Sequence, residues 1–255
     1  MGARAHLGPN ESVSPVRRAS AIGVPLRADL RGRLLRRYKR FLADVETEDG
    51  RVLTVHCPNP GAMTGCDTPG SPVRCSTSDD PRRKLRHTLE MIRVGRTWVG
   101  LHTGRANALA ARALETEALP ALAGYAEIRR EVTAEPGSRL DFRLTGGRRR
   151  KPLWLEVKSV TLAAGDVARF PDAVTTRGAR HMRALAKLRA AGDRAAVLFV
   201  VQRADCRRVE PAAEIDPAYA AALRDAARAG VEVHALRARV TPRRLVLDGA
   251  LPVAL

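Results

Sequence analysis

The chain has 255 residues, 45% of them hydrophobic, and its 45 lysines and arginines exceed its 27 acids to give a formal net charge of +18. This length allows one large domain or two small ones, and the charge favours a polyanionic partner, either nucleic acid or an anionic membrane surface. No run of about 18 apolar residues could cross a membrane. The first residues lack the apolar core of a secretory signal, and four cysteines are too few for a disulfide scaffold. We therefore expect a reduced, cytoplasmic protein without a membrane span.

Residues 1–21 are rich in Gly, Pro, Ser and Arg and have no hydrophobic period, so they are predicted to form a disordered leader, the alternative being a start codon assigned too early. The next part of the chain, 22–103, carries only strand signals, with Asp49-Gly50 as a hairpin turn. Short strands at this spacing, with no helix between them, predict a small closed barrel. The expected strands, in chain order, are 34–47, 52–57, 71–78, 85–94 and 97–102.

The pattern changes after residue 103, where helical and strand signals begin to alternate. The continuous apolar run 195–201 is typical of a strand covered on both faces. The alternation predicts an α/β domain with a mixed sheet over 104–255. The expected helices are 107–117, 175–191 and 216–229. The expected strands are 125–133, 139–144, 153–160, 194–201 and 231–236, followed by a hairpin near 245–247.

Two of these strands carry charges where a core is expected. Glu156 and Lys158 are two residues apart, so on a strand they share one face while their apolar neighbours point into the core. Charges on such a wall are costly unless they are used. Asp141, one strand earlier, reaches the same face if the two strands pair. A Glu-x-Lys triplet alone is common and usually exposed to solvent, so the apolar flanks and Asp141 are what favour a site.

This combination suits phosphodiester hydrolysis. Mg²⁺ or Mn²⁺ held by carboxylates neutralises the phosphodiester and lowers the pKa of a bound water. Asp141 and Glu156 are the predicted ligands, with the carbonyl of Val157 as a third. Lys158 would hold the attacking water or stabilise charge in the transition state. Glu115, on the first helix, is a further candidate ligand, although an exposed helix acid is at least as good an interpretation.

Three more residues near these strands are candidates. Asp172 lies in a loop before the second helix, where an aspartate more often caps a helix or makes a turn. Arg177 and His181 are four residues apart on that helix and share a face, so they are suited to contact a phosphate. A solvated helix face is the alternative interpretation.

Basic residues also gather in the predicted barrel. The first cluster consists of Arg37, Tyr38, Lys39 and Arg40, and the second of Arg82, Arg83 and Lys84. If residues 34–47 form one strand, successive members of the first cluster point to opposite faces. Cations beside rings are typical of barrels that bind single strands, in which cations follow the phosphates and rings stack on the bases. A basic edge strand that blocks aggregation is the alternative.

Five motifs in these regions are long and specific. They are RYKRFLADV at 37–45, HCPN at 56–59, GAMTGC at 61–66, EVKSVTL at 156–162 and FPDAVT at 170–175. On these motifs the chain resembles the sugar fermentation stimulation protein A family from about residue 34 to residue 253. The resemblance implies an OB-fold domain over 22–103 and a domain similar to PD-(D/E)xK nucleases over 104–255. By motif, the nuclease-type triad falls on Asp141, Glu156 and Lys158.

The resemblance also implies DNA binding and a link to the regulation of maltose and other sugar metabolism in bacteria. Two functions therefore compete. One is a Mg²⁺- or Mn²⁺-dependent nuclease acting on duplex or single-stranded DNA, with RNA a less favoured substrate. The other is a non-catalytic DNA-binding regulator on a nuclease-like fold. The acids favour the enzyme, because carboxylates near DNA repel phosphate unless a cation intervenes. An RNA-binding factor is a third, weaker hypothesis, and self-association into a homo-oligomer is left open.

Overall fold

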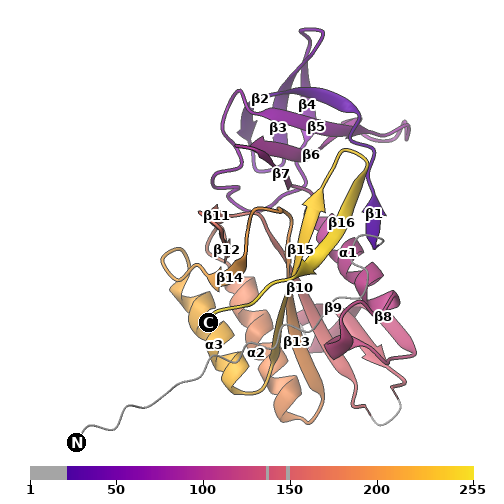
Figure 1. Ribbon diagram of the computed structural model, residues 1–255, viewed down its shortest axis with the longest axis vertical. Coiled ribbons are helices and arrows are strands. Elements are labelled where there is room, and N and C mark those ends of the chain that lie inside the picture. The colour runs from indigo at the N-terminus through magenta and orange to yellow at the C-terminus, as the bar shows by residue number, and fades with distance from the viewer. Residues whose placement is uncertain (1–21, 136–137, 148–149) are drawn as a thin grey trace, which may run out of the picture.

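The computed structural model describes residues 22–135, 138–147 and 150–255; the expected leader, 1–21, lies outside them. A β-barrel sits at one end of a larger α/β domain (Figure 1). The predicted two-part architecture, a small barrel followed by an α/β domain with a mixed sheet, is confirmed. Within the described residues, no helix is long and apolar enough to span a bilayer.

The barrel closes with five strands and carries a sixth at its edge. The strand order is β4-β3-β2-β5-β6, a bridge between β4 and β6 closes the ring, and β7 pairs with β6. Small and branched apolar side chains fill its interior, including Leu34, Val45 and Ile92. The strands are β2 (Leu30–Tyr38), β3 (Leu42–Thr47), β4 (Val52–His56), β5 (Pro72–Thr77), β6 (His87–Val94) and β7 (Thr97–Gly100).

The single strand predicted over 34–47 is wrong, because the chain reverses at residues 39–41. Tyr38 pairs with Leu42, and between them Lys39 and Arg40 have φ angles of 47° and 62°. Such left-handed backbone is what tight hairpins use, and it is usually supplied by Asn or Gly. The predicted alternation of the first basic cluster therefore fails after Tyr38, and Lys39 and Arg40 lie at a hairpin tip.

The larger domain is a seven-stranded sheet between two helical layers. Its strand order is β1-β16-β15-β13-β10-β9-β8, with β10, β13 and β15 parallel at the centre and the flanking pairs antiparallel. A small three-stranded sheet lies beside it. The large sheet comprises β1 (Gly23–Pro25), β8 (Glu127–Glu135), β9 (Ser138–Thr145), β10 (Leu153–Val160), β13 (Arg194–Val201), β15 (Glu232–Val240) and β16 (Arg244–Ala250). The small sheet comprises β11 (Ala163–Ala164), β12 (Val167–Phe170) and β14 (Arg208–Pro211).

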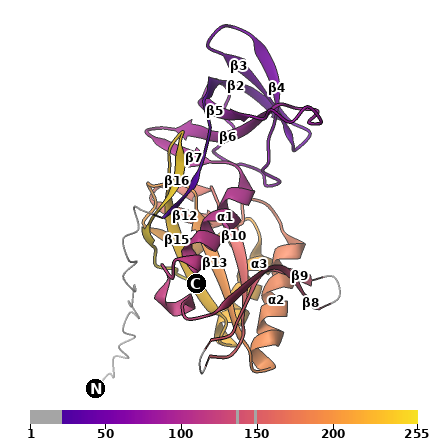
Figure 2. The same cartoon turned by 90° about the vertical axis from the view of Figure 1, so that its right-hand side faces the viewer.

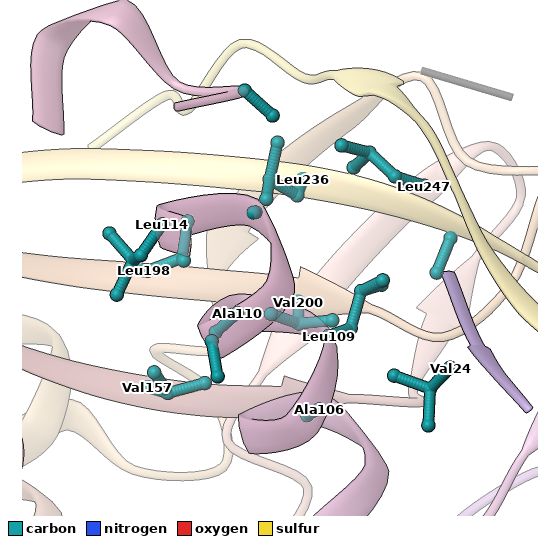
Figure 3. Close-up of a cluster of buried hydrophobic side chains, with 14 of the residues drawn as sticks. Val24, Ala106, Leu109, Ala110, Leu114, Val157, Leu198, Val200, Leu236 and Leu247 are labelled. Carbon is teal, nitrogen blue, oxygen red and sulfur yellow. The ribbon is translucent and has the colours of Figure 1, made fainter. Parts of the chain in front are cut away.

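The helices α1 (Thr103–Glu115), α2 (Thr176–Ala190) and α3 (Pro217–Arg228) cover the sheet from both sides (Figures 1 and 2). On one face α1 presents alanines and leucines at helical spacing, among them Leu109 and Leu114, to residues of the central strands such as Leu198 (Figure 3). On the other face α2 and α3 pack against Trp154, Phe199 and their neighbours. The parallel strands end near the barrel, since the amide of Gly100 in β7 donates to the carbonyl of Gln202 just after β13.

The barrel is inserted into the larger domain rather than placed before it. β1 pairs with β16 at the edge of the large sheet, and Val24 of β1 belongs to the core beneath α1 (Figure 3). The amides of Leu26 and Ala28 still donate to carbonyls of the larger domain, at Arg243 and Pro242. Although the predicted first domain begins at residue 22, the chain enters the barrel only at about Leu30.

Candidate active site

The predicted acids meet where β9 separates from β10. The ladder between the strands runs from Leu153–Leu144 to Leu155–Phe142 and then stops. At the next step, a carboxylate oxygen of Asp141 accepts a hydrogen bond from the amide of Val157 at 2.7 Å. This side chain thereby replaces the missing ladder bond, and it holds Asp141 in the gap between the strands.

Asp141 is also fixed from the helical layer. Its second oxygen accepts a hydrogen bond of 2.7 Å from the side-chain amide of Asn107 on α1. Burial, together with the nearby negative charge of Glu156, raises the pKa of Asp141 to about 6. Two carboxyl groups so close together disfavour simultaneous ionisation, and a cation between them removes that penalty.

Glu156 is buried and serves as the centre of a charged cluster. Its Oε1 accepts a hydrogen bond from Lys158 Nζ at 2.7 Å and lies 2.5 Å from His181 Nδ1, whereas its Oε2 has no hydrogen-bond partner. Burial alone would raise the pKa of Glu156, but the charge of Lys158 and the hydrogen bond to His181 outweigh it and lower the pKa. The group is therefore a carboxylate with one free oxygen.

Asp141, Glu156 and Lys158 line a cleft of about 670 Å³ between the two domains. A cavity of this size is typical of a small-molecule site. The larger domain supplies the start of α1, β10 and the loop leading into α2, and the barrel supplies Arg40 and residues 59–61. The polar and charged residues of the wall include Arg40, Asn59, Asp141, Glu156, Lys158, Asp172 and Arg177, and Gly61 lies among them.

The segment 58–63, called the barrel loop, is anchored from three directions. Arg37 donates hydrogen bonds to the carbonyls of Asn59, Gly61 and Ala62, at 2.8–3.1 Å. Thr103, at the start of α1, donates to the carbonyl of Pro58 through its amide and its hydroxyl. The third anchor comes from the loop before α2.

That third anchor is Asp172, whose carboxylate accepts the amide of Met63 at 2.9 Å. The carboxylate also lies directly against Gly61, where an added Cβ would come within 2.4 Å of both its oxygens. The barrel loop therefore touches the start of α1 and the loop before α2, which belong to opposite layers of the larger domain. Asp172, left open as cap or ligand by the sequence, joins the two domains.

The nucleic-acid contacts that were predicted in the barrel divide into two groups. Lys39, Arg40 and Lys84 are exposed, and of these Arg40 lines the cleft. Their role stays a prediction.

The remaining predicted contacts in the barrel have hydrogen-bond partners within the protein. Arg37 holds the barrel loop, and the hydroxyl of Tyr38 donates to the buried Asp44. Arg82 pairs with Asp80, and Arg83 donates to Thr88. Arg37, Tyr38 and Arg83 are partly buried, whereas Arg82 stays exposed on the surface beside Asp80. Contact of these four side chains with nucleic acid stays a prediction.

Two predictions about the helices need correction. His181 does not lie on a solvated face beside Arg177: its side chain is 2% exposed and contacts Glu156, while its Nε2 accepts a hydrogen bond from Arg177 Nε at 3.3 Å. Glu115 does not line the cleft, and its half-exposed carboxylate pairs with Arg112 and Arg130. Helical spacing indicated the shared side of α2, but it could not indicate how deeply α2 packs.

Asn107 was missed by the sequence reasoning. Its only signal is that it is an uncharged polar residue in the alanine- and leucine-rich α1. Among the described residues, no group of three or more His, Cys, Asp or Glu side chains forms a metal cluster. A metal site here would therefore rest on the pair Asp141 and Glu156 together with backbone oxygen.

Comparisons with known proteins agree with this arrangement. The model of the sugar fermentation stimulation protein RE domain matches residues 104–244, and that of the SfsA N-terminal OB domain matches residues 35–101. A sugar fermentation stimulation protein homolog of Geobacter sulfurreducens is 49% identical over 222 residues, covering 87% of this chain and 94% of the relative. Another, from Pseudomonas putida, is 50% identical over 228 residues, covering 88% and 95%.

A solved structure is also similar. It is described as Pyrococcus furiosus SfsA in complex with Ca²⁺, and it superposes with a TM-score of 0.81 at 28% identity, covering 89% of this chain and 96% of that one. The fold and the order of the two parts are therefore shared along nearly the whole chain.

Proposed function

Because the chain belongs to the sugar fermentation stimulation protein family, we propose that it is a DNA-binding protein with a divalent-cation-dependent phosphodiesterase site of nuclease type. A role in the regulation of sugar metabolism, including that of maltose, is also part of this proposal. The observation that carries it is the convergence of Asp141, Glu156 and Lys158 in one cleft that also contains Arg40 and Arg177.

The residues present fit a hard divalent cation. Glu156 keeps one buried oxygen without a partner, and the raised pKa of Asp141 reflects first its burial and then the second carboxyl, Glu156, that repels it. Asp141, Glu156 and the carbonyl of Val157 would hold Mg²⁺ or Mn²⁺, as oxygen ligands suited to these ions. The ion would supply charge neutralisation and a more acidic water. The Ca²⁺ named in the description of the Pyrococcus protein is a hard cation of the same class.

The protein's own groups have separable tasks in this proposal. Asn107 and the Val157 amide hold Asp141 in one orientation, and His181 does the same for Glu156. Lys158 carries a positive charge beside these carboxylates, where it orients a water or stabilises negative charge that develops on the phosphate. Arg40 and Arg177 lie on the cleft walls as phosphate contacts.

The test is cleavage of plasmid, linear duplex and linear single-stranded DNA, with and without Mg²⁺ or Mn²⁺. Asp141→Asn and Lys158→Ala are each expected to reduce the rate about 10²-fold or more, as is usual for removal of a group that stabilises transition-state charge. Glu115→Gln and Lys187→Ala are matched controls, because both side chains are exposed and outside the cleft.

Cleavage that survives both substitutions would overturn the site assignment. The competing function, a regulator that binds DNA without cutting it, predicts tight, salt-sensitive binding and no cleavage of any of these DNAs with either ion.

A further inference from the structure

The barrel loop determines what can reach the carboxylates. It lines the cleft through residues 59–61 and is hydrogen-bonded to Thr103 on the α1 side and to Asp172 on the α2 side. The loop therefore spans the cleft from one helical layer to the other. Asp141 and Glu156 lie on the wall formed by the sheet, so a substrate phosphate must enter between that wall and the barrel loop.

This loop is built to stay in place. Arg37 bonds three of its carbonyls, and the side chain of Asn59 accepts the amide of Gly61. Met63, at its far end, is fully buried in the barrel core. Gly61 packs so closely on Asp172 that no side chain fits between them. A loop with these anchors is a fixed wall, in contrast to a mobile lid, which would have few buried contacts.

Cations continue from the cleft onto one exposed side of α2. Arg177 lines the cleft, and Arg180 and Arg183 follow at helical spacing. None of the three forms an ion pair with a carboxylate in the described part of the chain, whereas many other arginines do. These three arginines, called the basic ridge, extend about 9 Å along the helix axis.

An exposed aromatic ring lies next to Arg40 in the chain, on the barrel side of the cleft. Phe41 follows Arg40 at the hairpin tip and is 44% exposed, which is unusual for a large apolar side chain in this protein. Proteins that bind single strands stack the bases on aromatic rings that lie beside cations. In a duplex the base faces are already stacked on one another and cannot take up such a ring.

On these grounds we propose that the cleft takes a single, unpaired DNA strand and excludes continuous duplex. The strand passes between the barrel loop and β10, its phosphates contact Arg40 and Arg177, and it leaves along the basic ridge. This inference rests on the proposed function for the chemistry, but not for the binding preference. Duplex DNA must first separate its strands, as it must for enzymes that act on an unpaired base.

The experiment uses three end-labelled DNAs of one sequence: a single strand, a blunt duplex and a duplex with a single-stranded tail. We expect the single strand and the tail to be cut at least about tenfold faster than the blunt duplex, because unpairing has an energetic cost. Cuts in the tailed DNA should stop near the junction. Equal rates on blunt duplex and single strand, both abolished by Asp141→Asn, would overturn the inference and leave the proposed function intact.

Binding gives an independent readout if nothing is cut. The double variant Arg40→Ala/Arg177→Ala is expected to weaken single-strand binding about tenfold or more and to leave duplex binding within about twofold. Arg207→Ala/Arg228→Ala removes the same charge from exposed positions outside the cleft and should affect neither. An equal loss for both DNAs in the cleft variant would contradict the inference.

The anchor offers a further check. Asp172→Ala frees the barrel loop from the α2 side, so it should narrow the difference between duplex and single strand in rate and in affinity. Asp225→Ala, an exposed acid on α3, is the control. A single-strand preference unchanged by Asp172→Ala, in a variant whose thermal unfolding shows that it folds, would contradict the role of the barrel loop.

Discussion

Asp141 combines an ionisable carboxyl with surroundings that oppose its charge. Its pKa is raised to about 6 from an ordinary value of 3.8, first by burial and then by Glu156. Between these two values the unfolded chain loses the proton while the folded chain keeps it. Stability from this group is therefore full at low pH and is lost as the pH rises toward 6.

Replacing Asp141 by Asn removes this penalty. Without divalent cations, Asp141→Asn is expected to raise the free energy of unfolding at pH 7.5 by about 1–3 kcal/mol, with the gain shrinking as the pH falls toward 4. Denaturant unfolding at several pH values measures this. Adding Mg²⁺ should stabilise the wild type and not the variant. A gain of equal size at every pH, or one shared by Glu115→Gln, would show that the buried charge of Asp141 is not its cause.

For single residues, the sequence predicted which side chains lie together in the site but not how deeply each one is buried. Alternation along a strand is local, so Asp141, Glu156 and Lys158 could be placed together from the sequence. It was harder to predict from the sequence which residue of a helix reaches the site. Glu115 and Asn107 are both on α1, but they are eight residues and about 12 Å apart, and only Asn107 reaches Asp141. His181 was placed on the correct side of α2, but its burial depends on what packs against that side.

The hairpin of β2 and β3 shows how two arginines three residues apart, Arg37 and Arg40, acquire different roles. Arg37 precedes the turn, and its guanidinium reaches the barrel loop as well as the carbonyl of Arg40. Arg40, within the turn, directs no side-chain hydrogen bond to another described residue and lines the cleft. The sequence could not separate them, because a turn formed by Lys39 and Arg40 lacks the Asn-Gly or Asp-Gly signal that marked the next hairpin.

Substitution of the two arginines should therefore have different effects. Arg37→Ala is expected to reduce the free energy of unfolding by about 2–3 kcal/mol, because partly buried carbonyls lose a charged donor. Arg40→Ala should change it by less than about 0.5 kcal/mol, as is usual for an exposed side chain. Denaturant unfolding of both variants at one pH provides the comparison. Similar losses for both would show that Arg37 is not the anchor of the barrel loop.

Over the whole molecule, many of the 45 lysines and arginines pair with acids on the surface, so few unpaired cations are concentrated on one path. The proposed path of the strand uses Arg40 and the basic ridge, which is four cations. Single-strand binding should then weaken with salt with a log–log slope of about −3.

Fluorescence anisotropy from low to moderate salt measures this slope. Arg180→Ala/Arg183→Ala should reduce its magnitude by about 1.4, in proportion to the two contacts removed. Arg207→Ala/Arg228→Ala should leave it unchanged. A slope near −1 in the wild type would indicate that these cations do not share one bound strand.

The two-part architecture was accessible from the sequence, because hairpin spacing and helix–strand alternation are strong local signals. The strand β1 was not, since three residues give no period and its partner, β16, lies more than 200 residues away. The predicted domain boundary at residue 22 was placed at the first strand signal. The domain to which a strand belongs is decided instead by the strand with which it pairs.

That insertion has a mechanical consequence. A domain attached by one linker can swing in any direction, whereas one attached at two points keeps a single axis of rotation. The barrel is attached at both ends, just after Ala28 and just before Thr103, and Asp172 grips Met63 as a third point. Three points fix a rigid body. The width of the cleft is therefore fixed by the fold before any ligand binds, and this width limits how thick a nucleic-acid strand can enter.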